Sequence, residues 1–156
     1  MSNEPEKLDA LLRALSDIYE NKLPFNRVLG LRILRLKPDG VTVSIDMRDA
    51  LIGNYVQGSL HGGVISSVLD TVGGLMATAG MVHSKLDQPQ EQIIQHIARV
   101  GTIDLRVDYL RPGRGQSFKA SAAIMRTGNK VAVTRMELHN DAHKLIAVGS
   151  GTYLIA

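Results

Sequence analysis

A His-Gly-Gly turn and a single carboxylate lie close together in the sequence and form its strongest candidate for chemistry. His61, Gly62 and Gly63 open an apolar segment of helical length, and Asp70 lies two turns further along it. The first N–H groups of a helix lack intrahelical partners and carry partial positive charge, which suits them to hold a polarised carbonyl oxygen. Asp70 is therefore a candidate base or nucleophile that acts on such a carbonyl.

The wheel of this helix separates a face of small residues from an apolar face. At about 100° per residue, Asp70 shares its face with small side chains, namely Ser66, Ser67, Gly73, Gly74 and Ala77. The opposite face is apolar throughout and comprises Ile65, Val68, Leu69, Val72, Leu75 and Met76. Because small side chains allow close approach, we expect the Asp70 face to be left for a ligand or a partner. The alternative is structural, with Asp70 hydrogen-bonded to hydroxyl groups in a tight helix–helix contact.

The spacing of the two features limits how they can act together. Gly62 and Asp70 are eight residues apart, which is about 12 Å along a helix. A reacting atom must lie about 3 Å from both the oxyanion donor and the attacking group, so one straight helix cannot present both to one carbonyl. If both act, Asp70 must meet Gly62 of a second copy, and an antiparallel pair of helices in a two-fold dimer creates two such sites.

The composition indicates one globular domain without thiol or membrane chemistry. A length of 156 residues suits a single domain, and the absence of cysteine excludes disulfides and thiolate catalysis. No apolar run is predicted to reach membrane-spanning length, and residues 1–6 lack the basic start and apolar run of a signal peptide. We therefore expect a cytoplasmic protein with no membrane partner.

Basic residues gather in the second half of the chain, although the net charge is only +3. Between residues 99 and 135 only Asp104 and Asp108 are acidic. The basic residues of that stretch are Arg99, Arg106, Arg111, Arg114, Lys119, Arg126, Lys130 and Arg135. Such a strip suits a compact polyanion, whereas a chain with no Trp and two Phe offers few stacking platforms for nucleic acid. The alternative is a solvated sheet face.

The remaining histidines do not predict a metal site. They are His83, His96, His139 and His143. A metal site needs three or four converging ligands, and only the last two of these lie near each other, around a turn. We expect neither a metal nor another cofactor.

Helical and strand patterns alternate along the chain and must position the candidate residues. Helical spacing covers residues 5–20 and 62–80, with a short helix expected after Pro89. Strand alternation covers residues 30–47, around the turn Pro38-Asp39-Gly40, and later the segments 103–109, 118–124, 131–136 and 145–155. One long helix within many strands predicts an α+β fold, in which a curved antiparallel sheet wraps around that helix.

These motifs give the chain a resemblance to a known family. His61-Gly62-Gly63 with Asp70 nine residues after the His resembles the hot-dog-fold acyl-CoA thioesterases of the phenylacetate-pathway (PaaI-like) type. Residues 101–113 are similar to the family's central strand with its Arg-Pro-Gly turn, and residues 145–149 to its last strand. The resemblance covers residues 28–155.

The resemblance also implies an architecture and an assembly. It implies a single hot-dog domain over residues 1–156, with a helical N-terminal extension over 1–25 and the hot-dog core over 26–156. Two copies form a homodimer in which the sheets join and the long helices run antiparallel, in agreement with the spacing argument. Dimers then pair into a dimer of dimers.

By matching position, the resemblance assigns a role to each central residue. Gly62 gives the N–H that polarises the thioester carbonyl, and Asp70 of the other subunit is the nucleophile or general base. His61 orients the turn or bonds near the carbonyl. Thr102 lies where some members carry a hydroxyl that helps to hold the lytic water.

The neighbours of these residues complete the expected site. Gly63 and Ser67 are expected to line the substrate site. The family usually has an Asn six residues before the His, but this position is Tyr55 and Asn54 lies seven before. A one-residue insertion in the loop would restore Asn54 to the site.

Basic residues near turns are candidates to bind the phosphates of CoA. Arg114 follows a Pro-Gly turn, and Arg126, Gly128 and Lys130 surround a strand–strand turn. The cations supply charge-assisted hydrogen bonds, and the glycine lets the backbone approach a phosphate.

The leading hypothesis is hydrolysis of a fatty or aromatic acyl-CoA to free acid and CoA without a cofactor. An acyl-thioester dehydratase or hydratase is the enzyme alternative, but it needs a paired His and acid at a hydroxyacyl group. The glycine turn and the mid-helix Asp70 favour hydrolysis. A non-catalytic acyl-CoA-binding dimer would use the same pocket and release no thiol.

Overall fold

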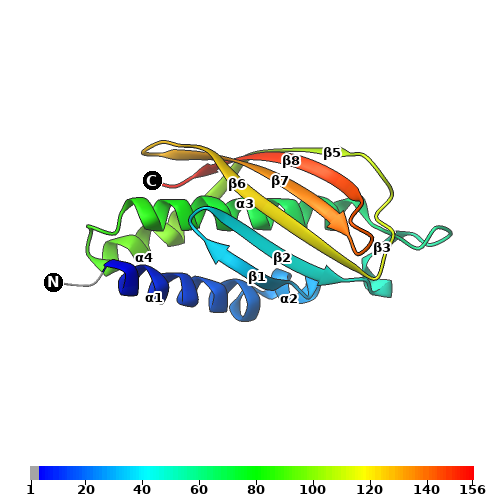
Figure 1. The fold of residues 1–156 in the computed structure, drawn as a ribbon, viewed down its shortest axis with the longest axis horizontal. Helices are drawn as coiled ribbons and strands as arrows, with labels where there is room; N and C mark the ends of the chain where they lie inside the picture. Colours follow the sequence, from blue (N-terminus) through cyan, green and yellow to red (C-terminus); the bar gives the residue numbers. More distant parts are fainter. Residues whose placement is uncertain (1–3) are drawn as a thin grey trace.

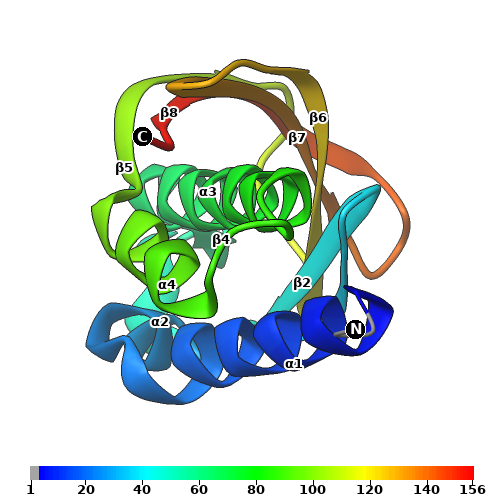
Figure 2. The same cartoon turned by 90° about the vertical axis from the view of Figure 1, so that its left-hand side faces the viewer.

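One long helix is held in the hollow of a curved antiparallel sheet (Figure 1). The computed structural model describes residues 4–156 of the chain. The central helix is α3 (Gly62–Ser84), and the main sheet has six strands. Figure 2 shows this sheet arching over α3, while the N-terminal helices lie across its open side. The α+β hot-dog fold expected from the sequence is confirmed.

The six strands follow the alternation predicted from the sequence. They are β1 (Arg32–Lys37), β2 (Gly40–Asp46), β5 (Gly101–Tyr109), β6 (Ser117–Thr127), β7 (Val131–Asn140) and β8 (Leu145–Leu154). All neighbours are antiparallel, and the order across the sheet is β1-β2-β6-β7-β8-β5. The predicted turn at Asp39 joins β1 to β2, with Lys37 opposite Gly40. Strands β1 and β5 are therefore the edges of the sheet.

Alternate side chains of the strands face α3 and form the core with its apolar side. Ala132 and Met136 of β7 are fully buried, as are Val68 and Leu75 of the helix. The predicted apolar face of α3 is thus confirmed. Full burial of an aliphatic side chain contributes about 1.5–3 kcal/mol, so this packing fixes the helix, and with it Asp70, against the sheet.

Helix α3 ends at Ser84, beyond the predicted end near residue 80, because Met81 and Val82 are still buried in the core. Among residues 4–156 it is the one helix long and apolar enough to cross a membrane. The sequence-based statement that no run reaches this length was therefore wrong. Since 67% of that apolar window is buried inside the protein, the helix serves as the core helix of the sheet.

Three helical segments precede the sheet. They are α1 (Glu4–Asp17), the short π-helix η1 (Ile18–Lys22) and α2 (Pro24–Leu29). The helical spacing expected from residue 5 onward is confirmed, and α1 buries Leu11, Leu12 and Leu15. Pro24 opens α2, a position where its missing N–H costs no helical hydrogen bond. Gly30 ends α2 with a φ of +67°, a conformation that glycine adopts without strain.

Short elements connect these parts to α3 and β5. After β2 come the 3₁₀ turn η2 (Asp49–Leu51) and the two-stranded pair β3 (Ile52–Asn54) and β4 (Ser59–Leu60). The short helix expected after Pro89 is confirmed as α4 (Gln90–Arg99), which leads directly into β5.

Candidate active site

The start of α3 presents the backbone donor that the sequence predicted. His61 is the N-cap, and its Nδ1 accepts a hydrogen bond from the N–H of Gly63 at 2.8 Å. The imidazole proton is then on Nε2, because a neutral ring that accepts at one nitrogen donates at the other. No acceptor for the N–H of Gly62 is found within residues 4–156. Gly62, rather than Gly63, therefore keeps a free donor for a carbonyl oxygen.

The turn before α3 is fixed by contacts from η2, from the end of β5 and from the loop after β5. The N–H of Leu60 donates to the carbonyl of Gly113, and the N–H of His61 to that of Leu51. Tyr109 donates its hydroxyl to the carbonyl of Gly62 at 2.9 Å. Tyr109 was not predicted from the sequence, because its contact joins residues 47 positions apart.

A cavity opens beside this turn. It measures about 350 Å³, and its wall includes Gly62, Ile65, Tyr109 and Gly113. The free N–H of Gly62 thus lies at the wall of a cavity rather than in the packed core. An N-terminal helix donor in such a place can bind a polarised oxygen.

Asp70 is held by two hydroxyl groups from neighbouring strands. Thr102 of β5 donates to Oδ1 at 2.9 Å, and Tyr153 of β8 donates to the same oxygen at 3.2 Å. The two residues stand directly opposite each other in the β5–β8 register. Burial, and then the charge and hydrogen bond of Asp70, raise the pKa of Tyr153. The phenol therefore stays protonated and acts as a donor.

Asp70 lines a second cavity, which measures about 180 Å³. Thr102 and Tyr153 lie in its wall, and the N-terminal helices contribute Tyr19, Leu23 and Asn26. Burial raises the pKa of Tyr19, and the Asp70 charge adds to that effect. The N-terminal segment thus helps to enclose the carboxylate.

The small-residue face of α3 is covered beyond Asp70, which corrects the expectation that this whole face is left for a ligand or partner. Gly73, Gly74 and Ala77 are buried. Tyr153 packs on the first two of these, since a Cβ on Gly74 would lie 3.3 Å from its ring. The hydroxyl contacts of Asp70 named in the structural alternative are present, but they come from strands and not from a second helix. The small side chains of α3 therefore make room for the ring of Tyr153 in the same chain.

Gly62 and Asp70 open into different cavities of one chain, as the spacing argument requires. The cavity at the helix start does not include Asp70, and the cavity at Asp70 does not include Gly62. Along α3 the two residues are about 12 Å apart. Within one chain the two residues therefore do not line a common cavity.

The other residues expected near the site are placed as follows. Ser67 donates its hydroxyl to the carbonyl of Gly63 at 2.6 Å, inside the helix itself. Asn54 lies on β3 opposite Ser59, and its side chain accepts from the N–H of Gln57 at 3.1 Å. Asn54 therefore closes its own loop in this chain and is not brought to Asp70.

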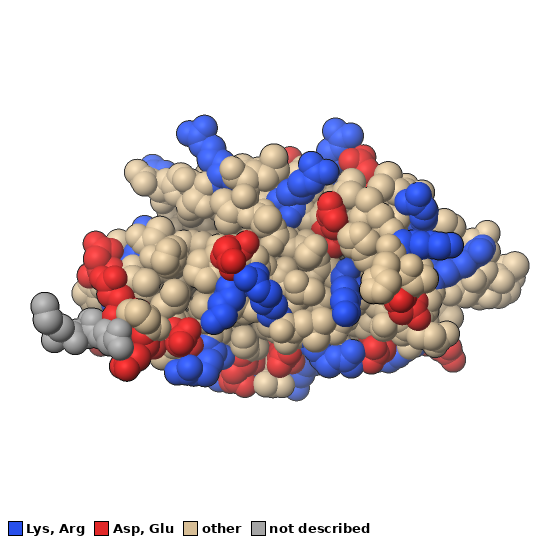
Figure 3. All heavy atoms as spheres, viewed as in Figure 1, with Lys and Arg blue, Asp and Glu red and all other residues tan. Residues whose placement is uncertain are grey.

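The candidate phosphate ligands lie at opposite ends of β6. Arg114 precedes the strand and accepts at its carbonyl from Asn140, whereas Arg126, Gly128 and Lys130 surround the far turn, where Gly128 pairs with Val131. Since a strand of eleven residues spans roughly 36 Å, the two groups cannot bind one phosphate within one chain. On the face shown in Figure 3, basic side chains are interspersed with acidic ones. That face supports the alternative of a solvated sheet surface better than a continuous basic strip.

No group of three metal-ligating side chains is found in the part of the chain that the structure describes. His139 lies 3.9 Å from Glu137, and His143 adopts a φ of +60° in the turn before β8. These histidines therefore have no third acidic or imidazole ligand beside them.

Comparison with known proteins relates these features to a family. Residues 57–147 match the family model described as the thioesterase superfamily. The chain is 40% identical over 144 residues to the medium/long-chain acyl-CoA thioesterase YigI of Escherichia coli, a match that covers 92% of this chain and 93% of that protein.

Two crystal structures are similar to this one over nearly their whole length. One is a Shewanella oneidensis protein related to the thioesterase superfamily, with a TM-score of 0.93 and 48% identity, covering 96% of this chain and 98% of that one. The other is a candidate thioesterase from Syntrophus aciditrophicus, with a TM-score of 0.87 and 44% identity, covering 97% and 99%.

Proposed function

Because the chain belongs to the thioesterase superfamily, we propose that it hydrolyses acyl-CoA thioesters to a free acid and CoA. The observation that carries the proposal is the pairing of a hydroxyl-bound carboxylate, Asp70, with a free helix N–H at Gly62, each at the wall of a cavity. A carbonyl polarised by such an N–H is open to attack by water or by a carboxylate. The similarity to YigI supports the same substrate class.

The proposed mechanism divides the work between two subunits. The N–H of Gly62 polarises the thioester carbonyl, and His61 keeps the turn in place through Gly63. Asp70 of the other subunit takes a proton from water, whose oxygen forms the new bond to the carbonyl carbon, or attacks that carbon itself. The C–S bond then breaks, and the CoA sulfur takes up a proton. Where Asp70 attacks the carbon itself, water then hydrolyses the resulting mixed anhydride, which releases the acid and restores the carboxylate. Thr102 helps to hold the water beside Asp70.

Dimerisation through the β5 edge is the proposed way to complete the site. β5 ends the sheet, so its backbone can pair with β5 of a second copy and join the two sheets. This arrangement brings α3 of one subunit antiparallel to α3 of the other and Asp70 toward the partner's Gly62 turn. A dimer of dimers remains part of the proposal.

The proposed acyl group is a medium or long fatty chain or an aromatic acid. Part of the wall of the Asp70 cavity is apolar and comes from Tyr19, Leu23 and Val100. This part suits an apolar chain better than a small charged one. YigI is a medium/long-chain thioesterase, which favours the fatty chain. We propose Gly63 and Ser67 as further residues at the substrate, Asn54 as a polar group from the loop, and Arg114, Arg126, Gly128 and Lys130 as candidate ligands of the CoA phosphates.

The test is release of free thiol from a panel of acyl-CoA esters of increasing chain length, with hydroxyacyl and enoyl esters included. We expect thiol release with saturated chains and an optimum at medium or long length. Formation of an enoyl ester from a hydroxyacyl ester without thiol would instead indicate a dehydratase. Tight binding of acyl-CoA with no thiol from any ester would indicate a non-catalytic binding protein.

A further inference from the structure

The ring of Tyr153 occupies a slot beneath Asp70 that glycines keep open. Tyr153 is only 1% exposed. A Cβ on Gly73 would collide with its hydroxyl, and a Cβ on Gly151 would lie 2.5 Å from that oxygen. The Oγ1 of Thr134 lies against the same point, 2.9 Å from where the Gly73 Cβ would stand. Residues of α3, β7 and β8 therefore fix where the phenol points.

The slot aims the phenol at one oxygen of Asp70. The hydroxyl donates to Oδ1 at 3.2 Å and to the backbone carbonyl of Asp70 at 3.1 Å. Thr102, its cross-strand neighbour, donates to the same Oδ1 at 2.9 Å. Within residues 4–156 no donor is found for Oδ2. One carboxylate oxygen is thus doubly bound, and the other is free at the cavity that Asp70 lines.

We infer that Tyr153 is a positioning residue for Asp70, which holds Oδ1 so that Oδ2 takes the proton from water or attacks the thioester. This inference rests on the proposed function. Hydrogen bonds donated to a carboxylate favour its charged form, so loss of the phenol favours protonation of Asp70. The titratable groups that face Asp70 are Tyr153 of β8 and Tyr19 of η1, with the Thr102 hydroxyl from β5. Burial raises the pKa of both tyrosines, so both remain neutral over the working range and Tyr153 remains a donor.

The first test is Tyr153→Phe, which keeps the ring in its slot and removes only the hydroxyl. We expect kcat to fall about tenfold with KM changed less than about twofold, since the bond acts on the reacting group and not on substrate binding. The acidic limb of the kcat–pH profile should move to higher pH, because the carboxylate loses one of its two hydrogen-bond donors. Thr42→Val, which removes a hydroxyl from β2, a strand separated from β8 by β6 and β7, should leave both values unchanged.

A purely structural role for Tyr153 gives a different result. Tyr153→Phe would then lower the melting temperature and leave the acidic limb where it is in the folded protein. Thr102→Val removes the other donor to Oδ1, so it should move the limb in the same direction. The double variant should shift it by an amount different from the sum, because both hydroxyls bind one oxygen.

A measurement without substrate keeps this inference separate from the proposed function. The carboxyl carbon of Asp70 can be followed by ¹³C NMR during a pH titration of the unliganded protein. Its titration midpoint should rise in Tyr153→Phe, and an unchanged midpoint in the folded variant overturns the role of Tyr153. A raised midpoint in a protein that hydrolyses no thioester would overturn the proposed function and leave the positioning of Asp70 in place.

Discussion

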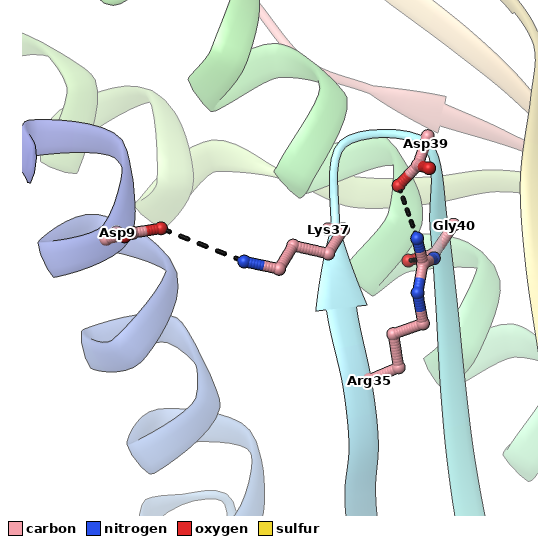
Figure 4. Close-up of polar contacts among 5 residues, drawn as sticks. All are labelled: Asp9, Arg35, Lys37, Asp39 and Gly40. Carbon is pink, nitrogen blue, oxygen red and sulfur yellow. Dashed lines mark hydrogen bonds and ion pairs between the residues drawn. The ribbon is translucent and has the colours of Figure 1, made fainter. Parts of the chain in front are cut away.

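The two edge strands of the sheet differ in how far the rest of the chain covers them. At β1, Lys37 reaches Asp9 of α1 at 3.9 Å, and Arg35 reaches Asp39 of the following turn at 2.7 Å (Figure 4). Charged side chains on an edge strand, together with a helix beside it, keep other chains from pairing there. The chain thus closes its β1 edge by itself.

One backbone donor of the β1 edge has a partner as well. The N–H of Ile33 donates to the carboxylate of Glu20, which comes from η1. Arg32 adds a two-point ion pair with Asp46 of β2. A second chain would have to displace these contacts before it could pair with β1.

The β5 edge is left open. It is nine residues long, and the side chains of Ile103 and Tyr109 are 57% and 53% exposed. Within the described part of the chain its one ion pair joins Arg106 to Asp108 of the same strand. A long uncovered edge is a template for pairing. The open edge is also the one that carries Thr102 to Asp70, so assembly and chemistry are expected at the same strand.

The substitution with the largest expected effect changes catalysis without changing assembly. Asp70→Asn keeps the shape of the side chain but removes the base or nucleophile, so we expect the rate of thiol release to fall about a thousandfold. The proposed dimer should still form and the melting temperature should change little, because the amide can still accept from Thr102 and Tyr153. Enzyme kinetics and light scattering on the same sample check both statements. Turnover near that of the unmodified protein would remove Asp70 from the mechanism.

The next prediction compares the same substitution at the two edge strands. Leu34 of β1 and Ile103 of β5 are each the extra residue at an irregularity of strand pairing, and they are 52% and 57% exposed. Ile103→Asp places a charge on the proposed interface, so it should yield monomers and lose most of the activity. Leu34→Asp is the matched control and should keep both the assembly and the activity. Light scattering measures the mass, and monomers from Leu34→Asp alone would reverse the assignment of the edges.

The start of α3 and the sheet could be predicted from the sequence because both depend on local patterns. A His-Gly-Gly turn before an apolar segment determines an N-cap and free N–H groups, whatever packs around it. The strands of the second half alternate over their whole length, so their positions follow from burial of one face. Thr102 as a neighbour of Asp70 came from the family resemblance and not from any local signal.

The surroundings of Asp70 could not be predicted because they depend on contacts between distant residues. Tyr153 is 83 residues from Asp70 in the sequence, and only the β5–β8 register brings it opposite Thr102. The glycines of α3 were interpreted as room for a ligand, whereas they make room for this tyrosine. A face of small residues indicates that another group packs closely against it. Tertiary packing determines whether that group is a ligand or a side chain of the same protein.

A mixing experiment tests whether the open edge joins two half-sites. Gly62→Pro removes the donor N–H at the first helical position, where proline is tolerated, and His61 before it already has the extended conformation that proline requires. Alone, Gly62→Pro and Asp70→Asn should each be inactive. After co-refolding, about half of the dimers are mixed and each has one intact site of two, so about a quarter of the original activity should return. Mixed dimers that are verified by mass and still inactive would show that the two residues do not act across the interface.

The smallest expected effect concerns CoA recognition at the two ends of β6. Arg114 follows Gly113, which lines the cavity beside the Gly62 turn, whereas Arg126 lies at the far turn. If the nucleotide enters past the helix start, Arg114→Ala should raise KM for acyl-CoA by about threefold to tenfold with little change in kcat, and the effect should weaken as salt rises. Arg126→Ala should have the smaller effect, unless the partner subunit brings its far turn to the nucleotide.

An acyl-pantetheine substrate, which lacks the nucleotide, serves as the control, because neither variant should change its KM. Equal changes in KM with both substrates would show that the arginines act in folding. A larger rise in KM from Arg126→Ala than from Arg114→Ala would place the CoA site at the end of the sheet where α3 ends.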